Sequence, residues 1–123
     1  MTLSDTPGAP CWIELFTTDP EAAAAFYGDL FGWSFTDPNP DLGGYQSVLL
    51  DGEIVAGMMR NDGTTDEPSA WTTYLETADI DDTARRIAAH GGKVLVGPHQ
   101  VGGLGHMLFA TDPGGAMVGA WQP

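Results

Sequence analysis

Two stretches of the chain, Trp12-Ile13-Glu14-Leu15-Phe16-Thr17-Thr18-Asp19 and Thr72-Thr73-Tyr74-Leu75-Glu76-Thr77-Ala78-Asp79, correspond to each other at an offset of 60 residues. In each, an alternating segment leads to an Asp, and an Ala-rich segment and a Gly follow. The alternation is typical of a strand, whose successive side chains point to opposite faces. One unit therefore occurs twice. Two such units, each unable to cover its own sheet, tend to pair and leave a concavity between them.

The residues after each alternating stretch carry helix signals. Asp19 is a favoured N-cap, Pro20 suits the first helical position, and Gly32 suits the residue after the helix. The pattern predicts one helix over 20–30 and another over about 81–90. The first helix is expected to bury Ala23, Phe26, Tyr27 and Leu30. Strands are predicted at 12–17, 33–36, 44–50, 54–59, 71–77, 93–96, 105–110 and 116–121.

This order of elements, a strand, a helix and three strands, predicts an α+β fold. We expect two paired βαβββ modules that form a curved, cup-shaped mixed sheet with the helices outside. The length of 123 residues fits one domain. Its expected parts are a flexible arm at 1–9, a first module at 10–60, a linker at 61–69 and a second module at 70–123.

Composition narrows the possible partners. Seventeen acidic residues against four basic ones give a net charge of -13, which argues against nucleic-acid binding. No apolar run is long enough to span a bilayer, and the first ten residues lack the features of a signal peptide, so no membrane contact and a cytoplasmic location are expected. Cys11 is the only cysteine, which leaves no disulfide framework.

Several motifs resemble those of one family. The run Phe26-Tyr27, followed by Leu30-Phe31-Gly32-Trp33, and the closing turn Asp112-Pro113-Gly114-Gly115 resemble the vicinal oxygen chelate superfamily. That superfamily includes glyoxalase I, extradiol dioxygenases, and the fosfomycin and bleomycin resistance proteins. The resemblance covers residues 10–122. It implies two paired βαβββ modules around an open cup, and a homodimer.

The resemblance also implies positions for a metal site. Enzymes of the superfamily hold a divalent metal with four His, Gln or Glu side chains, on the first and last strands of each module. In this sequence those positions fall at Trp12, Thr72, Gly119 and near residues 56–58. None supplies an imidazole or carboxylate, and Thr72 offers only a weak hydroxyl. We therefore expect no metal and no cofactor, which argues against glyoxalase, dioxygenase and fosfomycin-transferase chemistry.

Aromatic residues are the alternative basis for a binding site. Alternation puts Trp12, Glu14 and Phe16 on one face of the strand predicted at 12–17. In the same way it puts Thr72, Tyr74 and Glu76 on the corresponding face of the strand predicted at 71–77. Large flat side chains suit a flat or amphipathic ligand, and Gly57 and Gly119 would leave room for it. The expected ligand-binding residues are Trp12, Phe16, Gln46, Met58, Thr72, Tyr74 and Trp121. Alternatively, the aromatic residues fill the core or a dimer interface.

Three titratable residues are candidates for catalysis: Glu14, Glu76 and His106. A carboxylate in the middle of an aromatic strand is costly to bury, so it could bind a cationic ligand or act as a general base. His106 is expected to point inward beside Gln46 and to act as an acid, a base or a hydrogen-bond donor. Alternatively, the two carboxylates reach solvent or pair with Arg60, Arg85, Arg86 or Lys93, and His106 is structural.

The sequence thus predicts a metal-independent protein that binds a small molecule and sequesters an aromatic or cationic metabolite or antibiotic, as the resemblance to bleomycin resistance proteins implies. A second hypothesis is a cofactor-free isomerase, cyclase or lyase that uses Glu14, Glu76 or His106 for proton transfer. A third is a dimerisation partner whose cup is filled by side chains.

Overall fold

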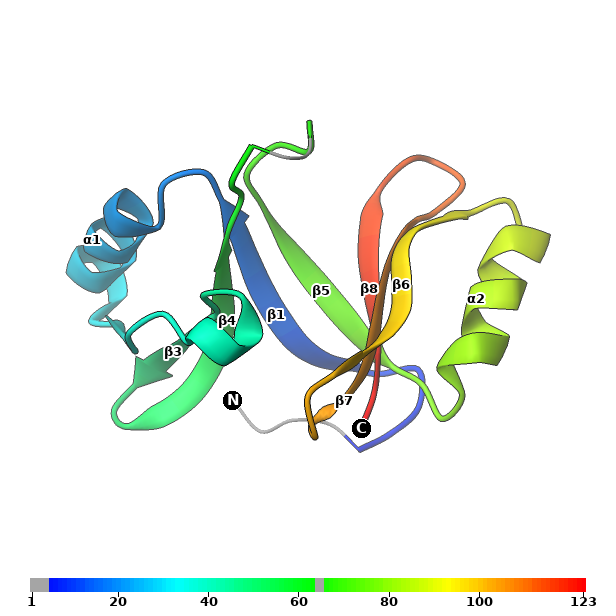
Figure 1. Ribbon diagram of the computed structural model, residues 1–123, viewed down its shortest axis with the longest axis horizontal. Coiled ribbons are helices and arrows are strands. Elements are labelled where there is room, and N and C mark those ends of the chain that lie inside the picture. Colours follow the sequence, from blue (N-terminus) through cyan, green and yellow to red (C-terminus); the bar gives the residue numbers. More distant parts are fainter. Residues whose placement is uncertain (1–4, 64–65) are drawn as a thin grey trace. The chain divides into compact units, whose positions relative to one another are not determined.

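The computed structural model describes residues 5–63 and 66–123, which form two compact units. The first unit is Ile13–Trp71, and the second combines residues 5–12 with 72–123. Two α-helices and eight strands in mixed parallel and antiparallel pairing make up the described chain, as predicted for the α+β class. The two α-helices belong to different units (Figure 1).

The first unit has a four-stranded sheet in the order β2-β3-β4-β1. β1 pairs in parallel with β4, whereas β2 with β3 and β3 with β4 are antiparallel. The elements are β1 (Pro10–Thr17), α1 (Pro20–Phe31), β2 (Ser34–Phe35), the 3₁₀ turn η1 (Pro40–Leu42), β3 (Gln46–Leu50) and β4 (Glu53–Arg60).

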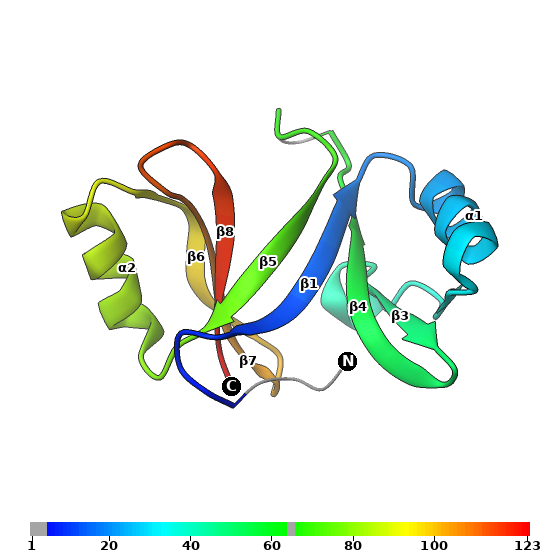
Figure 2. The same ribbon diagram turned by 180° about the vertical axis from the view of Figure 1, so that it is seen from behind.

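The second unit repeats this topology with the order β5-β8-β7-β6. Its first and last strands, β5 and β8, are again parallel, and the other pairs are antiparallel. Its elements are β5 (Ala70–Glu76), α2 (Ile80–Ala89), β6 (Lys93–Val101), β7 (Gly105–Thr111) and β8 (Met117–Gln122). Seen from behind, α2 lies alongside β6 and β8 (Figure 2). The predicted repeat of a βαβββ module is confirmed.

The two helices begin in the same way. Asp19 Oδ1 accepts a hydrogen bond from the Ala22 N–H at 3.0 Å, and Asp79 Oδ1 accepts one from the Asp82 N–H at 3.0 Å. The Thr two residues before each Asp accepts a hydrogen bond from the N–H of that Asp. These caps satisfy N–H groups that a helix start leaves without a partner. The corresponding Asp residues of the sequence repeat therefore have one structural role.

Each helix covers a small apolar core on one face of its sheet. In the first unit this core contains Leu15, Val48, Ala56 and Met58, with Ala23 and Tyr27 of α1 packed against it. In the second unit it contains Ile80, Leu108, Ala110 and Ala120, with Ala84 and Ile87 of α2. The opposite face of each sheet carries the candidate functional residues.

The prediction that α1 buries Phe26 and Leu30 is wrong. Phe26 is 57 % exposed, Leu30 56 % and Phe31 55 %. Apolar residues occur on several sides of this helix, so their spacing alone does not identify the side that packs on the sheet. Ala23 and Tyr27 take that position. Tyr27 also accepts a hydrogen bond from Trp71 Nε1 at 2.8 Å.

The segment predicted as a loose arm is partly ordered. The Gly8 N–H donates to the Glu76 carbonyl at 2.8 Å, and the Glu76 N–H donates to the Ala9 carbonyl at 2.9 Å. These bonds fix the chain before β1 against the end of β5. The rest of the predicted arm, residues 1–4, lies outside the described residues.

None of the described helices has the length and apolar character that crossing a membrane requires. The cytoplasmic location stays a prediction.

Candidate functional site

The uncovered side of the second unit is an aromatic face. Tyr74 and Phe109 both lie beside Gly119 in the strand register, and Glu76 and Met107 both lie beside Trp121. Register partners on neighbouring strands point to the same side of a sheet. We call these six residues the aromatic face. Alternation along β5 adds Thr72, which is buried. The predicted common orientation of Thr72, Tyr74 and Glu76 is confirmed, and Trp121 shares it.

Residues from the start of β1 complete the packing of this face. Cys11, Tyr74 and Met107 form its buried centre, and Trp12, Val101, Phe109 and Trp121 pack against that centre partly exposed. The Cys11 thiol lies 3.5 Å from the Tyr74 carbonyl oxygen. Burial, and then the nearby Glu76 carboxylate, raises the pKa of the Cys11 thiol. Cys11 is thus a neutral packing group at neutral pH.

Tyr74 fills the space that Gly119 leaves. A Cβ atom added to Gly119 would lie 2.4 Å from Tyr74 Cδ1 and 2.8 Å from its Cγ, closer than van der Waals contact allows. Tyr74 is only 3 % exposed. The room expected for a ligand at Gly119 is therefore occupied by the Tyr74 ring. Tyr74 supports the face from within, and Trp12, Phe109 and Trp121 present the accessible aromatic surface.

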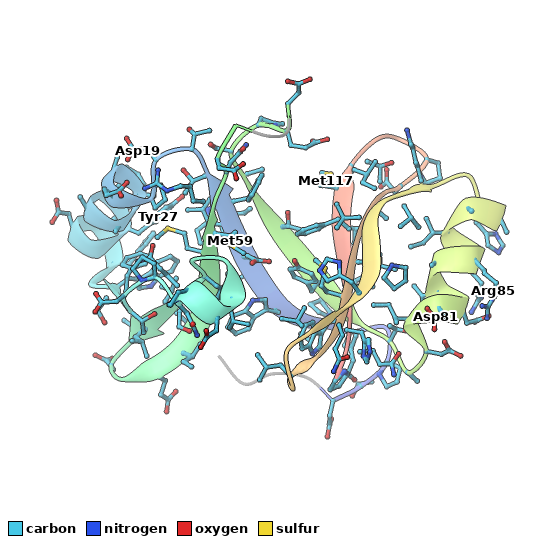
Figure 3. The ribbon with its side chains drawn as sticks, viewed as in Figure 1. Asp19, Tyr27, Met59, Asp81, Arg85 and Met117 are labelled. Atoms are coloured by element: carbon cyan, nitrogen blue, oxygen red, sulfur yellow. The ribbon has the colours of Figure 1, made fainter. Side chains whose placement is uncertain are left out.

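Glu76 is the charged group of the aromatic face. Its side chain is 8 % exposed, and among the described residues its carboxylate forms no ion pair and no side-chain hydrogen bond. Two of the basic residues considered as partners bind elsewhere: Arg60 pairs with Glu21 at 2.6 Å and Arg85 with Asp82 at 3.4 Å. Arg85 and Asp81 project from α2 away from the sheet (Figure 3).

A cavity of about 390 Å³ borders Glu76. Its wall also includes Pro7 and Gly8 of the segment before β1, and residues of α2, β5 and β8. A second cavity of about 350 Å³ lies farther along α2, lined by Arg86 and His90 among others. Of the predicted site residues, Glu76 alone borders either cavity. Leu108 and Ala120, which belong to the core beneath α2, also line the larger cavity, so this cavity lies on the helix side of the sheet and not on the aromatic face.

The uncovered side of the first unit is smaller and more polar. Glu14 and Ser47 both lie beside Gly57 in the register, one on each side of β4, and Phe16 lies beside Met59. We call these five residues the Glu14 face. Met59 is on β4 (Figure 3). Glu14, Phe16, Ser47 and Met59 are all half-buried.

Tyr45, which the sequence reasoning missed, reaches over this face. A Cβ atom added to Gly57 would lie 1.5 Å from Tyr45 Oη and 2.3 Å from Cζ. The tip of the phenol ring therefore rests on the Gly57 backbone. The only signal in the sequence was the absence of a side chain at Gly57, which does not say which residue takes the space. Gly57 and Gly119 thus have the same role, each making room for a tyrosine.

Gln46 and Met58, predicted to contact a ligand, lie on the opposite side of the sheet. Met58 is the register partner of both Leu15 and Gln46, and Leu15 and Met58 belong to the core beneath α1. Met58 is 1 % exposed. Gln46 donates its side-chain N–H to the Thr36 carbonyl at 2.8 Å. These two residues are therefore structural.

His106 also differs from the prediction. It is the register partner of Gln122 and lies one residue from Met107, so it shares the helix side with Leu108 and Ala110. Gln122 on that side accepts a hydrogen bond from the Ile80 N–H at 2.8 Å, at the start of α2. His106 thus lies on the opposite side of its sheet from the aromatic face and is not part of the candidate site.

The residues do not fit the metal site that the resemblance implied. Two of the four positions are glycines covered by the tyrosines described above, and Trp12 and Thr72 supply no strong ligand. Over residues 5–63 and 66–123, no group of three or more His, Cys, Asp or Glu side chains is placed to hold a metal ion.

Comparison with known proteins agrees with the architecture. The family model described as the Glyoxalase/Bleomycin resistance protein/Dioxygenase superfamily matches residues 11–119. Among solved structures, methylmalonyl-CoA epimerase from Mycobacterium tuberculosis superposes with a TM-score of 0.64 at 15 % identity, covering 98 % of this chain and 92 % of the epimerase chain. At that identity the similarity shows the fold alone.

Two curated relatives are more similar in sequence. The "Putative glyoxylase CFP32" of Mycobacterium bovis is 41 % identical over 119 residues, which cover 94 % of this chain and 46 % of the relative. The anthracycline biosynthesis protein DnrV of Streptomyces peucetius is 38 % identical over 130 residues, covering 94 % of this chain and 47 % of the relative. The chain thus spans about half the length of these relatives. With the family model matching most of its length, the chain belongs to the Glyoxalase/Bleomycin resistance protein/Dioxygenase superfamily.

Proposed function

We propose that this protein binds a small aromatic molecule with a cationic or hydrogen-donating group, next to Glu76 in the second unit, and that it does so without a metal. The observation that carries the proposal is the Glu76 carboxylate on the aromatic face, which has no ion-pair partner within the described chain although the residue is only 8 % exposed. Its oxygen atoms still reach solvent, since no side-chain N or O atom of the described residues is both buried and without a hydrogen-bond partner. A cation held beside such a partly shielded carboxylate gains more than one in open water, because the local dielectric is lower.

The surroundings of Glu76 support an aromatic ligand. Trp121 lies directly beside it in the register, and Trp12 and Phe109 offer further partly exposed rings. Aromatic faces attract cations as well as flat rings, so a ligand that combines the two gains from both. The biosynthetic relative DnrV, named for anthracyclines, is consistent with an aromatic small molecule. Sequestration of such a molecule is the proposed role.

Proflavine, a planar cation, is a suitable probe for this proposal. We expect Glu76→Gln to weaken proflavine binding about 10-fold, because a hydrogen bond or ion pair to a buried charged group is worth ~1.5 to 3 kcal/mol. Fluorescence titration measures the affinity. Glu53→Gln removes the same charge from an exposed residue and should change the affinity less than about 2-fold.

Two results would contradict the proposal. If Glu53→Gln weakens binding as much as Glu76→Gln, the cation is attracted only by the net charge of the protein. If EDTA abolishes binding and added Zn²⁺ or Mn²⁺ restores it, the claim of metal independence is lost. Acridine at alkaline pH, a ring system of similar size that is uncharged and has no hydrogen-bond donor, should bind equally to the wild type and to Glu76→Gln.

We also propose that two copies of the chain associate through α1. Its exposed residues Phe26, Leu30 and Phe31 form an apolar patch, flanked by the exposed Asp29, on a strongly acidic protein. The curated relatives are about twice as long, and a second copy would provide a comparable total length.

Light scattering should give a mass of twice the 13.0 kDa of one chain. The Leu30→Lys variant should have the mass of a single chain. A wild type that stays monomeric at micromolar concentration would exclude this association.

A further inference from the structure

A groove runs along α2 on the helix's side toward the sheet of the second unit. The two cavities of about 390 and 350 Å³ share four wall residues: Thr83, Arg86, Ile87 and Val118. The cavities therefore adjoin each other, and we call the two together the α2 groove. Pockets that hold small molecules have volumes of ~300 to 1,000 Å³. The α2 groove is thus large enough for a small ligand.

Apolar side chains form the floor of the α2 groove. Leu108 and Ala120 belong to the buried core beneath α2, and Ile87 and Val118 pack against that core partly exposed. All four border one or both cavities. A ligand chain that covers Ile87 and Val118 removes their remaining apolar surface from water, which favours binding. The floor of the groove therefore suits the hydrocarbon part of a ligand.

The two acidic residues in the wall of the groove are directed elsewhere. Glu76 carries its carboxylate on the aromatic face, on the other side of the sheet. Asp112 Oδ1 accepts hydrogen bonds from the N–H groups of Gly114 and Ala116, both at 2.9 Å. These bonds hold the Asp112 carboxylate within its own turn. The groove is therefore able to receive an anion if a cation is placed in it.

Arg86 supplies a positive charge where the two cavities adjoin. Within the part of the chain that the structure describes, its guanidinium forms no ion pair and no hydrogen bond. The other two arginines, Arg60 and Arg85, each pair with a carboxylate. A guanidinium can hold a carboxylate through two parallel hydrogen bonds. The carboxylate that would match Arg86 is thus best supplied by a ligand.

We propose that the α2 groove is a binding site for a small molecule in which a carboxylate is joined to an apolar chain. Arg86 binds the carboxylate, and the chain lies against Ile87 and Val118. His90, in the wall of the smaller cavity, can donate a further hydrogen bond to the carboxylate. Binding involves no covalent step. This site is on the opposite side of the sheet from the aromatic face, so the inference goes beyond the proposed function and does not depend on it.

Octanoate is the probe for this site, because it is a carboxylate with a short apolar chain. We expect Arg86→Gln to weaken octanoate binding about 5-fold in a calorimetric titration, the effect of losing a well-aligned ion pair at an exposed side chain. Octanol, which has the same chain without the charge, should bind equally to the wild type and to Arg86→Gln. Butyrate, which keeps the carboxylate and half of the chain, should bind the wild type more than about 10-fold more weakly than octanoate.

Arg85→Gln is the matched control. It removes the same charge from the neighbouring residue, which pairs with Asp82 and borders neither cavity. The octanoate affinity of this variant should differ from that of the wild type by less than about 2-fold. Thermal melts establish that both variants are folded. An equal loss in the two variants, an equal loss of octanol and octanoate binding in Arg86→Gln, or no saturable octanoate binding by the wild type would refute the inference.

The position of the bound probe provides an independent test. In methyl NMR spectra, octanoate should shift the signals of Ile87 and Val118 in the groove and leave that of Met107 on the aromatic face unchanged. A shift at Met107 without shifts at Ile87 and Val118 would place the probe on the aromatic face and overturn the inference. The two proposals fail separately, because Arg86→Gln should change the proflavine affinity, and Glu76→Gln the octanoate affinity, by less than about 2-fold.

Discussion

Gly119→Ala is expected to destabilise the protein by about 2 to 3 kcal/mol, the upper part of the usual range for overpacking a core. The added Cβ would lie 2.4 Å from Cδ1 and 2.8 Å from Cγ of Tyr74. The Cγ atom is the root of the ring and moves little unless the backbone moves. Because Tyr74 is 3 % exposed and packs on Cys11 and Met107, the ring has no free space to enter. Urea denaturation measures the loss.

Gly57→Ala provides the comparison. The added atom there would meet Tyr45 Oη and Cζ, the far end of a half-buried side chain that can swing toward solvent. We expect a loss of about 1 kcal/mol. If Gly119→Ala is as stable as the wild type, Tyr74 is not confined over Gly119, and the aromatic face is more adaptable than described.

Leu15→Ala is expected to cost about 2 to 5 kcal/mol through lost burial and the cavity left behind. Leu15 is 6 % exposed and packs with Val48, Ala56 and Met58 under α1. Such a loss is a large part of the total stability of a small domain. Thermal melts should therefore show a strongly lowered midpoint, with the proflavine affinity of the folded fraction nearly unchanged.

Trp12→Ala should show the reverse balance. Trp12 is only partly buried at the margin of the aromatic face, so less protein packs on it than on Leu15. We expect a smaller loss of stability and a loss of ~1 to 3 kcal/mol in proflavine affinity, as for an aromatic contact residue. If Trp12→Ala unfolds the protein as readily as Leu15→Ala, the tryptophan is a core residue and the binding proposal loses its main aromatic contact.

Local signals predicted much of the fold. Asp19 and Asp79 cap their helices as expected, and Gly32 follows α1 with the positive φ of 72° that favours glycine. The sequence repeat also predicted the order of elements correctly, since the two corresponding stretches begin the same series of a strand, a helix and three strands. Such features depend on neighbours in the sequence, so a sequence is enough to find them.

Strand length was predicted less well where tertiary context overrides a local rule. β6 continues from Lys93 to Val101 past Pro98, whereas the prediction ended at residue 96. Proline is normally excluded from strands because it cannot donate to a neighbouring strand. Among the described strands, β6 pairs only with β7, at the edge of the second unit's sheet, and register shifts interrupt that pairing around Pro98. An edge strand tolerates such a residue.

Only the part of the candidate site that follows from the alternation of side chains along a single strand was predicted correctly. Alternation correctly grouped Thr72, Tyr74 and Glu76, because all three lie on one uninterrupted strand. It failed for Gln46, Met58 and His106, since the side that a later strand presents depends on its register with a partner far away in the sequence. Tyr45 was missed because its role depends on contact with Gly57, which no local pattern reveals.

The boundary between the two packed units falls inside β1, so the packed units do not coincide with the two copies of the sequence repeat. Its residues Pro10 to Trp12 pack with the second copy of the repeat, although they belong to the first strand of the first module. A fragment cut at the sequence repeat, residues 70–123, would therefore lack Cys11, Trp12 and the backbone bonds of Gly8 and Ala9 to Glu76. The second unit is therefore complete only when it is covalently joined to residues that precede the first unit. This requirement favours keeping both copies of the repeat in one gene.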